Sequence, residues 1–241
     1  MNNGLVVIPT YNEIENIESI IRAVFALNKK FHILIVDDNS PDKTFEKVKE
    51  LQNEFPNQLF LKVGTKKAGL GTAYVLGFKW ALQQQYEYIF EMDADFSHNP
   101  SDIEKLHEAC SVGEADMAIG SRYIRGVNVV NWPLSRVLLS YFASVYVDII
   151  TGMKIHDATA GFICYKKEVL QNIDLDKIKF VGYAFQIEMK YRAFCKGFKI
   201  VEVPIIFTDR TMGQSKMSNG IIKEAVFGVI SLRIKKLLNR L

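Results

Sequence analysis

One pattern repeats four times in the first hundred residues: a short run of strand-forming residues, a polar turn, and a segment with apolar residues at helical spacing. The four strand-like runs are 4–8, 32–36, 59–63 and 88–92. Their largely apolar character suits strands covered on both faces, as in a parallel sheet. The pattern therefore predicts an α/β fold, and 241 residues suffice for one such domain.

Two aspartates separated by one residue stand where the fourth run ends. Asp93 and Asp95 are followed by Ser97, and Mg²⁺ or Mn²⁺ is often held by only one or two carboxylates, with substrate phosphates and water completing the shell. The alternative is a turn that uses these residues for local hydrogen bonds. Ser101 and Glu104 have the spacing of a capping box and are expected to cap the next helix themselves. That leaves the two aspartates and the serine available for a metal.

The first two turns place more polar residues at the same predicted edge of the sheet. Tyr11 and Glu13 follow the first strand, and Asn12 between them is expected to cap the next helix. Asp37 and Asp38 end the second strand, where an acidic side chain can hydrogen-bond a ribose or a base. For each of these residues, turn and cap chemistry is the competing interpretation.

The third turn, 66–72, contains two glycines but lacks the Gly-Lys-Ser/Thr ending of a P-loop. We therefore exclude a P-loop nucleoside triphosphatase. No Gly-x-Gly-x-x-Gly follows the first strand, which disfavours a nicotinamide dehydrogenase.

The second half of the chain departs from the repeat. Arg122 follows a predicted strand at 115–120, where it either binds phosphate oxygens or forms a surface ion pair. Segment 132–153 is mostly apolar, but its uncharged part, 137–147, is shorter than the roughly 20 residues that cross a bilayer. A buried helix and a helix on a membrane surface both remain open.

Three further features complete this half. Asp157 lies in a turn of small and polar residues and is a candidate for orienting a sugar or an arginine. A helix is predicted over 182–196, and Glu188 within it has either a function or a favourable place in the field of the helix. The last predicted strand, 199–207, contains Pro204, which indicates an edge or a bulge.

The bulk properties exclude some classes. A formal charge of +3 is too small to argue for nucleic acid. Cys110, Cys164 and Cys195 are far apart and show no metal-ligand spacing, so we expect neither disulfides nor zinc, and a reducing compartment fits. The N-terminus has no pattern of a secretory signal.

We expect a main domain over 1–215 and a basic amphipathic helix over 216–241. The tail ends with four cations, Arg233, Lys235, Lys236 and Arg240. Such an end either contacts anionic lipid or forms a solvated helix face.

Six segments together resemble the glycosyltransferases of family 2 that have the GT-A fold, and among these the polyprenol (dolichol) monophosphate mannose synthases. The segments are VIPTYNE (7–13), VDDNSPD (36–42), KAGLGTA (67–73), MDADFSH (92–98), GSRY (120–123) and RTMGQSK (210–216). The resemblance implies a Rossmann-like, mostly parallel central sheet flanked by helices, with a C-terminal helical tail.

The resemblance also implies roles for individual residues. It assigns nucleotide binding to seven positions: Pro9, Tyr11, Glu13, Asp37, Asp38, Asp93 and Ala94. It makes Asp93, Asp95 and Ser97 metal ligands, although relatives often have Gln at the serine position. It assigns catalysis to Asp95, Arg122 and Arg210, and acceptor or phosphate binding to Arg136, Arg210 and Lys216.

The implied reaction moves mannose from GDP-mannose to a polyprenyl (dolichyl) monophosphate, with inversion and with Mg²⁺ or Mn²⁺ as cofactor. A phosphate oxygen is already anionic near neutral pH, so the reaction needs charge stabilisation more than a general base. Since the acceptor is a lipid, we expect a peripheral enzyme at the cytoplasmic face of a membrane. It would attach through 132–153, through 219–241, or through a small membrane-protein partner.

Two alternatives stay open at this point. One is transfer of another sugar, for example from UDP-glucose, to polyprenyl phosphate or to a polysaccharide. The other is a regulatory subunit that binds a nucleotide sugar without turnover.

Overall fold

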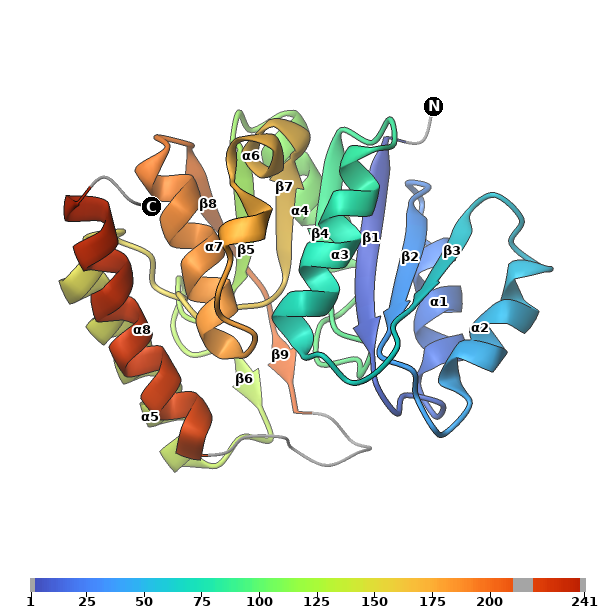
Figure 1. The fold of residues 1–241 in the computed structure, drawn as a ribbon, viewed down its shortest axis with the longest axis horizontal. Helices are drawn as coiled ribbons and strands as arrows, with labels where there is room; N and C mark the ends of the chain where they lie inside the picture. Colours follow the sequence, from blue (N-terminus) through green and yellow to red (C-terminus); the bar gives the residue numbers. More distant parts are fainter. Residues whose placement is uncertain (1–2, 210–218, 239–241) are drawn as a thin grey trace.

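The computed structural model describes residues 3–209 and 219–238, and its centre is a seven-stranded sheet with the order β3-β2-β1-β4-β7-β5-β8 (Figure 1). The strands are β1 (Gly4–Thr10), β2 (His32–Asp37), β3 (Leu59–Val63), β4 (Tyr88–Glu91), β5 (Met117–Ser121), β7 (Ile163–Lys166) and β8 (Ile200–Pro204). Only β7 runs antiparallel to its neighbours, β4 and β5. The mostly parallel sheet predicted from the repeat is confirmed.

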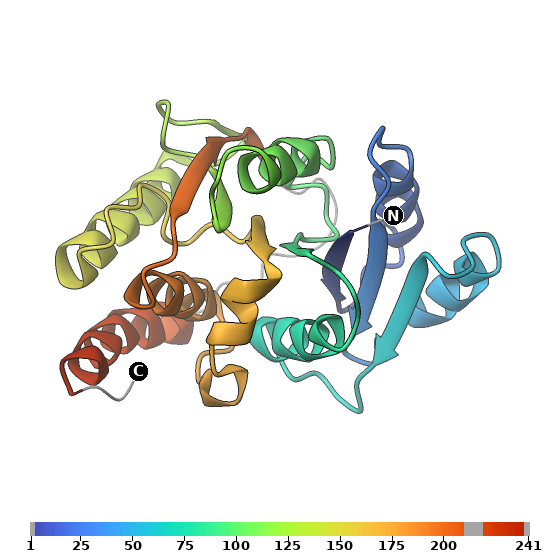
Figure 2. The same ribbon diagram turned by 90° about the horizontal axis from the view of Figure 1, so that it is seen from above.

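Helices cover both faces of this sheet (Figure 2). They are α1 (Ile17–Phe25), α2 (Thr44–Gln52), α3 (Leu70–Leu82), α4 (Asp102–Ser111), α5 (Leu134–Thr151), α6 (Lys167–Asn172), α7 (Tyr183–Cys195) and α8 (Asn219–Leu237), with a short 3₁₀ helix, η1 (Leu175–Lys177). Helices α1, α2 and α4 pack on one face, and α3, α6 and α7 on the other, where α5 and α8 add further apolar side chains. The strands are therefore buried from both sides, which explains their apolar runs.

Strand β1 lies inside the sheet and pairs with β2 and β4 in parallel register. The turns that follow these strands therefore meet at one edge, the lower edge in Figure 1. A second, small sheet lies at the same edge and pairs β6 (Val129–Val130) with β9 (Phe207–Thr208). It ties the chain before α5 to the chain after β8.

The predicted helix caps were wrong at two places. Asn12 has a left-handed backbone (φ 59°) and its N–H donates to Ser40 Oγ at 3.0 Å, while α1 begins only at Ile17. The intervening residues form a turn in which the carbonyl of Glu13 accepts from the N–H groups of Asn16 and Ile17. Asn12 therefore joins its loop to the loop after β2 instead of capping α1.

The capping box at Ser101 and Glu104 is also absent. Ser101 already has helical backbone angles, and its hydroxyl donates to Asn99 Oδ1 at 2.9 Å. Glu104 accepts the N–H of Lys29 at 2.8 Å. The asparagine two residues earlier holds the helix start, and the glutamate joins α4 to the loop after α1.

Other boundaries agree with the sequence in part. The apolar segment 132–153 forms α5, and the helix predicted over 182–196 is α7. The single strand predicted over 199–207 was wrong in its length, because Pro204 ends the edge strand β8 and Phe207 begins β9 of the second sheet. All three cysteines are free.

Helix α5 is exposed to an unusual degree for an apolar helix. By length and composition its 18 residues could cross a membrane, and only 17% of them are buried. Leu134, Leu138, Phe142, Val145 and Ile149 form an exposed stripe along it. Helix α8 lies beside it, at the end of the molecule opposite β3 (Figure 1), where the Tyr146 hydroxyl donates to the carbonyl of Val226.

Candidate active site

A cavity of about 290 Å³ opens at the carboxyl edge of the sheet. The polar side chains in its lining come from segments far apart in the sequence: Asp93, Asp95, Ser97, His98, Arg122, Arg136, Ser140, Thr159, Gln186 and Asp209. The structure thus brings together the predicted metal ligands and two of the predicted arginines. Arg210 and Lys216 lie outside the described residues.

Asp93, Asp95 and Ser97 follow β4 and have only oxygen donors to offer. The N–H of Ser97 donates to Asp95 Oδ1 at 3.1 Å, which curls the loop around the carboxylate. Within residues 3–209 and 219–238 the buried Ser97 hydroxyl has no hydrogen-bond partner. Two carboxylates and a hydroxyl that lacks such a partner fit a hard divalent cation.

His98, at the end of this loop, packs against two aromatic rings. It is buried, stacks on Phe162 with ring centroids 4.9 Å apart, and meets Phe207 edge-on. Burial lowers the pKa of His98 to about 4, although the charge of Asp95 acts in the opposite direction. His98 is therefore neutral and has a structural role beside the aspartates. From the sequence it was interpreted only as a residue of the turn.

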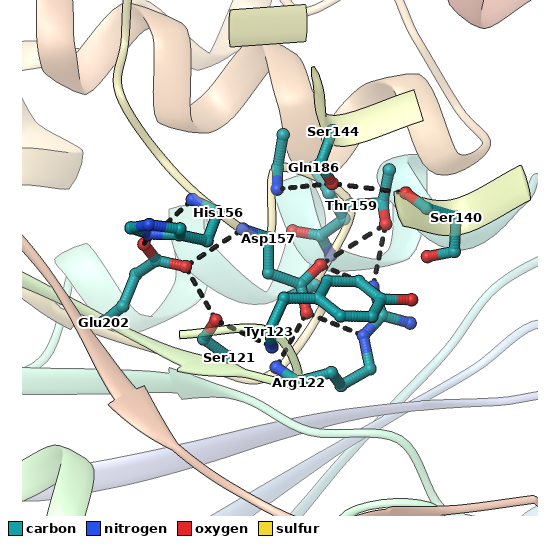
Figure 3. Close-up of polar contacts among 12 residues, drawn as sticks. Ser121, Arg122, Tyr123, Ser140, Ser144, His156, Asp157, Thr159, Gln186 and Glu202 are labelled. Carbon is teal, nitrogen blue, oxygen red and sulfur yellow. Dashed lines mark hydrogen bonds and ion pairs between the residues drawn. The ribbon is translucent and has the colours of Figure 1, made fainter. Parts of the chain in front are cut away.

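Arg122 is fixed by Asp157, as Figure 3 shows. The carboxylate accepts from Nε at 2.7 Å, from Nη2 at 2.5 Å, and from the main-chain N–H of Arg122 at 2.9 Å. The guanidinium also lies 5.3 Å from the ring centroid of Trp132 and 5.5 Å from that of Phe207. The expectation that Asp157 orients an arginine is confirmed, and the surface ion pair is excluded because both side chains are buried.

Glu202 on β8 holds the loop that carries Asp157 (Figure 3). Its two carboxylate oxygens accept from the main-chain N–H groups of His156 and Asp157, each at 2.9 Å, and from the hydroxyl of Ser121 at 2.7 Å. This role could not be predicted from the sequence, because Ser121 and His156 lie 81 and 46 residues from Glu202 in the chain and the pairing of β5 with β8 brings them together.

Arg136 stands at the start of α5 and reaches toward the same cavity. It pairs with Asp209 at 2.9 Å and lies 4.1 Å from the ring centroid of Trp132. Arg122 and Arg136 therefore contact the same indole ring, which brings two positive charges to one wall of the cavity.

Of the predicted nucleotide residues, Asp93 lines this cavity, whereas those at the ends of β1 and β2 lie outside its lining. Asp37 is fully buried and accepts from Thr10 Oγ1 and from both the N–H and the hydroxyl of Ser40. Asp38 accepts the N–H groups of Ala68 and Gly69. Both carboxylates therefore fix the loops around them.

Other residues of this region have different surroundings. Tyr11 lies under the ammonium group of Lys67, 4.3 Å from the ring centroid. Pro9 belongs to β1, Glu13 begins the turn before α1, and Ala94 is buried and lies between Asp93 and Asp95 in the chain.

Beneath the cavity lies a buried polar group that the sequence did not reveal. Glu91 accepts from the Tyr165 hydroxyl at 2.6 Å and from Gln186 Nε2 at 2.5 Å. Burial raises the pKa of Glu91 to about 7, while these hydrogen bonds and the charge of Lys190 act to lower it. Lys190 donates to the carbonyl of Ala160 at 2.5 Å.

Glu188, in contrast, has a structural role. It pairs with Arg192 at 2.7 Å and accepts the N–H groups of Lys179 and Phe180, so it fixes the segment that precedes α7.

The remainder of the cavity is apolar. Helices α5 and α8 contribute Leu139, Phe142, Ala143, Tyr146, Val147, Val226 and Val229, and Leu70, Ile187, Ile205 and Phe207 come from other parts of the chain. A single cavity is therefore lined both by carboxylates and arginines and by apolar side chains of two exposed helices.

The sequence model of glycosyl transferase family 2 matches residues 5–174. The chain is similar to the polyprenol monophosphomannose synthase of Mycolicibacterium smegmatis, with 47% identity over 236 residues, which cover 98% of this chain and 89% of that protein. It is 44% identical over 225 residues to the undecaprenyl-phosphate mannosyltransferase of Micrococcus luteus, covering 93% and 91%. The dolichol-phosphate mannosyltransferase of Pyrococcus furiosus is 40% identical over 226 residues, but this chain covers only 60% of it.

Solved structures share the architecture at low sequence identity. A mannosyltransferase from Pyrobaculum calidifontis in complex with GDP-Man and Mn²⁺ superposes with a TM-score of 0.60 at 14% identity, covering 98% of this chain and 74% of that one. A glucosyl-3-phosphoglycerate synthase from Mycobacterium tuberculosis in complex with UDP gives a TM-score of 0.67 at 13% identity, covering 98% and 80%. At this identity the likeness concerns the fold.

Proposed function

The chain belongs to glycosyl transferase family 2 and has the GT-A fold, and we propose that it transfers mannose from GDP-mannose to a polyprenyl monophosphate at a membrane surface. The observation that carries the proposal is the cavity, because its lining combines carboxylates and arginines, which suit a metal and phosphates, with apolar side chains of α5 and α8, which suit a lipid. The relatives named as mannose transferases to polyprenyl phosphates support the choice of sugar and acceptor.

In the proposed reaction an oxygen of the lipid phosphate attacks the anomeric carbon of mannose. The new carbon–oxygen bond forms as the bond to the diphosphate breaks, GDP leaves, and the configuration inverts. The attacking oxygen is already charged, so the protein contributes mainly position and electrostatic stabilisation.

Asp93, Asp95 and Ser97 would hold Mg²⁺ or Mn²⁺, which supplies positive charge to the leaving diphosphate when bound. Arg122 would bind a phosphate group, since Asp157 fixes its fork and the aromatic rings restrict its movement. Arg136, with Arg210 and Lys216 as predicted from the sequence, would bind the acceptor phosphate and prevent repulsion between the two anions.

The nucleoside would lie over the turns after β1 and β2. One side of this proposed nucleoside site would be formed by Pro9, Tyr11 and Glu13. The loops on its other side are held in shape by the buried Asp37 and by Asp38, which accepts the N–H groups of Ala68 and Gly69. In this proposal Asp37 acts through the loop that it holds.

The lipid would enter between α5 and α8, with the enzyme attached to the cytoplasmic face of a membrane. The exposed stripe of α5 continues near the exposed Phe227, Ile230 and Ile234 of α8, and Lys235 and Lys236 end that helix. Such a surface suits an interface of apolar chains and anionic headgroups. A small membrane-protein partner on the same helices is the alternative form of attachment.

Mass spectrometry of products tests the function. The full chain is incubated with Mn²⁺, GDP-mannose and a polyprenyl phosphate in detergent micelles, and the expected product is a mannosyl phosphate lipid together with GDP. Parallel reactions with UDP-glucose test the competing donor. Donor binding without any transfer would favour the non-catalytic alternative, and a glucosyl lipid in place of the mannosyl lipid would overturn the choice of donor.

A further inference from the structure

Among the atoms of the cavity wall that lack a hydrogen-bond partner in the described part of the chain is the amide oxygen of Gln186. Gln186, near the start of α7, is 1% exposed and lines the cavity, and its Oε1 forms no hydrogen bond within the described part of the chain. We propose that Oε1 of Gln186 accepts a hydrogen bond from a hydroxyl group of the transferred sugar, and that it thereby selects among donor sugars. This inference rests on the proposed function.

The orientation of the amide is fixed by Glu91. Gln186 Nε2 donates to Glu91 Oε2 at 2.5 Å, and the other oxygen of that carboxylate accepts from the Tyr165 hydroxyl at 2.6 Å. In its ionised form Glu91 only accepts hydrogen bonds, so this form requires the NH₂ side of the amide. The carbonyl oxygen is consequently held on the other side, and rotating the amide would place two oxygen atoms against each other.

The neighbouring wall is made of small residues. Gly120, Ala160 and Gly161 line the same cavity as Gln186, and a Cβ atom added at Gly161 would lie 3.3 Å from Nε2. Lys190 holds the carbonyl of Ala160 at 2.5 Å, which keeps this wall in place. The wall therefore offers space for a compact ligand beside one fixed acceptor.

The chemistry of the acceptor identifies its partner. An amide oxygen needs a ligand group that carries a hydrogen, whereas diphosphate and phosphate oxygens are acceptors at neutral pH and the lipid chain has no polar hydrogen. The proposed function has the nucleoside over the turns after β1 and β2, and the residues of these turns do not line this cavity. Among the groups of the two substrates, the sugar hydroxyls are what remains, and the sugar must lie between the metal site and the apolar side chains of α5 and α8.

Donor analogues that each lack one hydroxyl test this inference. Purified wild type and Gln186→Met are assayed with GDP-mannose and with its 2-, 3-, 4- and 6-deoxy forms. A site built to bind a hydroxyl rejects the analogue that lacks it. For wild type, we expect kcat/KM with one of the analogues to be lower than with GDP-mannose by about 10-fold or more. For Gln186→Met, the kcat/KM values for that analogue and for GDP-mannose should agree within about 2-fold. Binding of GDP alone should be unchanged in Gln186→Met.

Two further variants keep the result interpretable. Tyr191→Phe removes a buried hydroxyl from the same helix without touching the cavity lining, and it should keep the wild-type pattern across the analogues. Glu91→Gln no longer determines the orientation of the Gln186 amide, so it should partly reduce the discrimination between GDP-mannose and the deoxy analogues. This variant tests the inference even if Gln186→Met does not fold.

The outcomes separate the two proposals. If wild type forms no mannosyl lipid from GDP-mannose, the proposed function fails. If wild type does form it, two results would overturn the role of Gln186: a Gln186→Met enzyme as sensitive to every analogue as wild type, or, where that variant does not fold, undiminished discrimination in Glu91→Gln.

Discussion

Asp157 accepts three hydrogen bonds from Arg122, two from the guanidinium and one from the main-chain N–H of the same residue. The pair is buried and joins the end of β5 to the loop before β7. Because one carboxylate fixes both the side chain and the backbone of the arginine, the direction of the guanidinium is determined by the fold before any substrate binds.

Asp157→Asn is therefore expected to be severe. The amide keeps one acceptor oxygen and loses the charge, which leaves a buried guanidinium without its counter-ion. We expect the free energy of unfolding at pH 7 to fall by about 3–5 kcal/mol and mannose transfer to fall by roughly 100-fold or more. Chemical denaturation and single-turnover assays measure the two effects. A fully stable and active variant would contradict the positioning role.

The pair also makes a pH-dependent contribution to stability. Burial alone would raise the pKa of Asp157, but the charge and hydrogen bonds of Arg122 outweigh it and hold the pKa below its ordinary value. A depressed carboxyl pKa stabilises the fold above the unfolded pKa of about 3.9, and this contribution is lost as the pH falls through the folded pKa. Wild type should exceed Asp157→Asn by a constant margin from pH 7 to about 5, and by less below about pH 4. Denaturation curves across this range show whether the margin narrows.

Glu202 should act on the reaction through the loop that it holds. Glu202→Gln keeps one acceptor for the four hydrogen bonds from Ser121, His156 and Asp157. We expect kcat to fall by about 3- to 10-fold with little change in KM for GDP-mannose, because Arg122 is displaced while the donor site stays. Glu114→Gln on the exposed Glu114–Lys199 pair is the matched control and should behave as wild type. An equal loss in both variants would indicate a general effect of charge.

The metal site gives a graded prediction. Asp95→Ala removes a carboxylate, whereas Ser97→Ala removes a neutral hydroxyl. With GDP present, we expect Mn²⁺ affinity to fall by more than 100-fold in Asp95→Ala and by about 10-fold in Ser97→Ala. Electron paramagnetic resonance of free Mn²⁺ measures both. Unchanged affinity in Ser97→Ala would remove the serine from the ligand set, and EDTA should abolish transfer in wild type.

The sequence predicted well those features that depend on neighbouring residues. Buried strands require continuous apolar runs, and parallel strands send their carboxyl ends to one edge, so the meeting of Asp93, Asp95 and Arg122 followed from position alone. The role of Asp157 was predicted only in part: the sequence left open whether this acid orients a sugar or an arginine, and Arg122 lies 35 residues away in the chain.

What the sequence did not reveal depends on contacts between distant segments. Glu202 lies about 45 residues from the loop that it holds, and Glu91 is 95 residues from Gln186. Ser101 failed as a cap because Asn99 took its place, and Asn12 because Ser40 of the next loop bonds its N–H. Each residue type suited the local role, and the tertiary structure supplied a different partner.

Membrane attachment is the last prediction, and it concerns the two exposed helices. Ile149 on α5 is 75% exposed and Phe227 on α8 is 71% exposed, and neither lines the cavity. If these stripes lie in the lipid interface, each side chain adds a favourable transfer free energy of about 1.5–3 kcal/mol, and a glutamate there opposes binding to anionic lipid.

We therefore expect Ile149→Glu and Phe227→Glu each to lower the partition coefficient on vesicles containing anionic lipid by about 10-fold or more, measured by co-sedimentation. Val112→Glu is the matched control, because Val112 is also 75% exposed but follows α4 on the other face of the sheet. Turnover of a short, water-soluble polyprenyl phosphate should stay near wild type in all three, since the cavity lining is unchanged. Wild-type partition in both helix variants would exclude attachment through these helices and favour a membrane-protein partner.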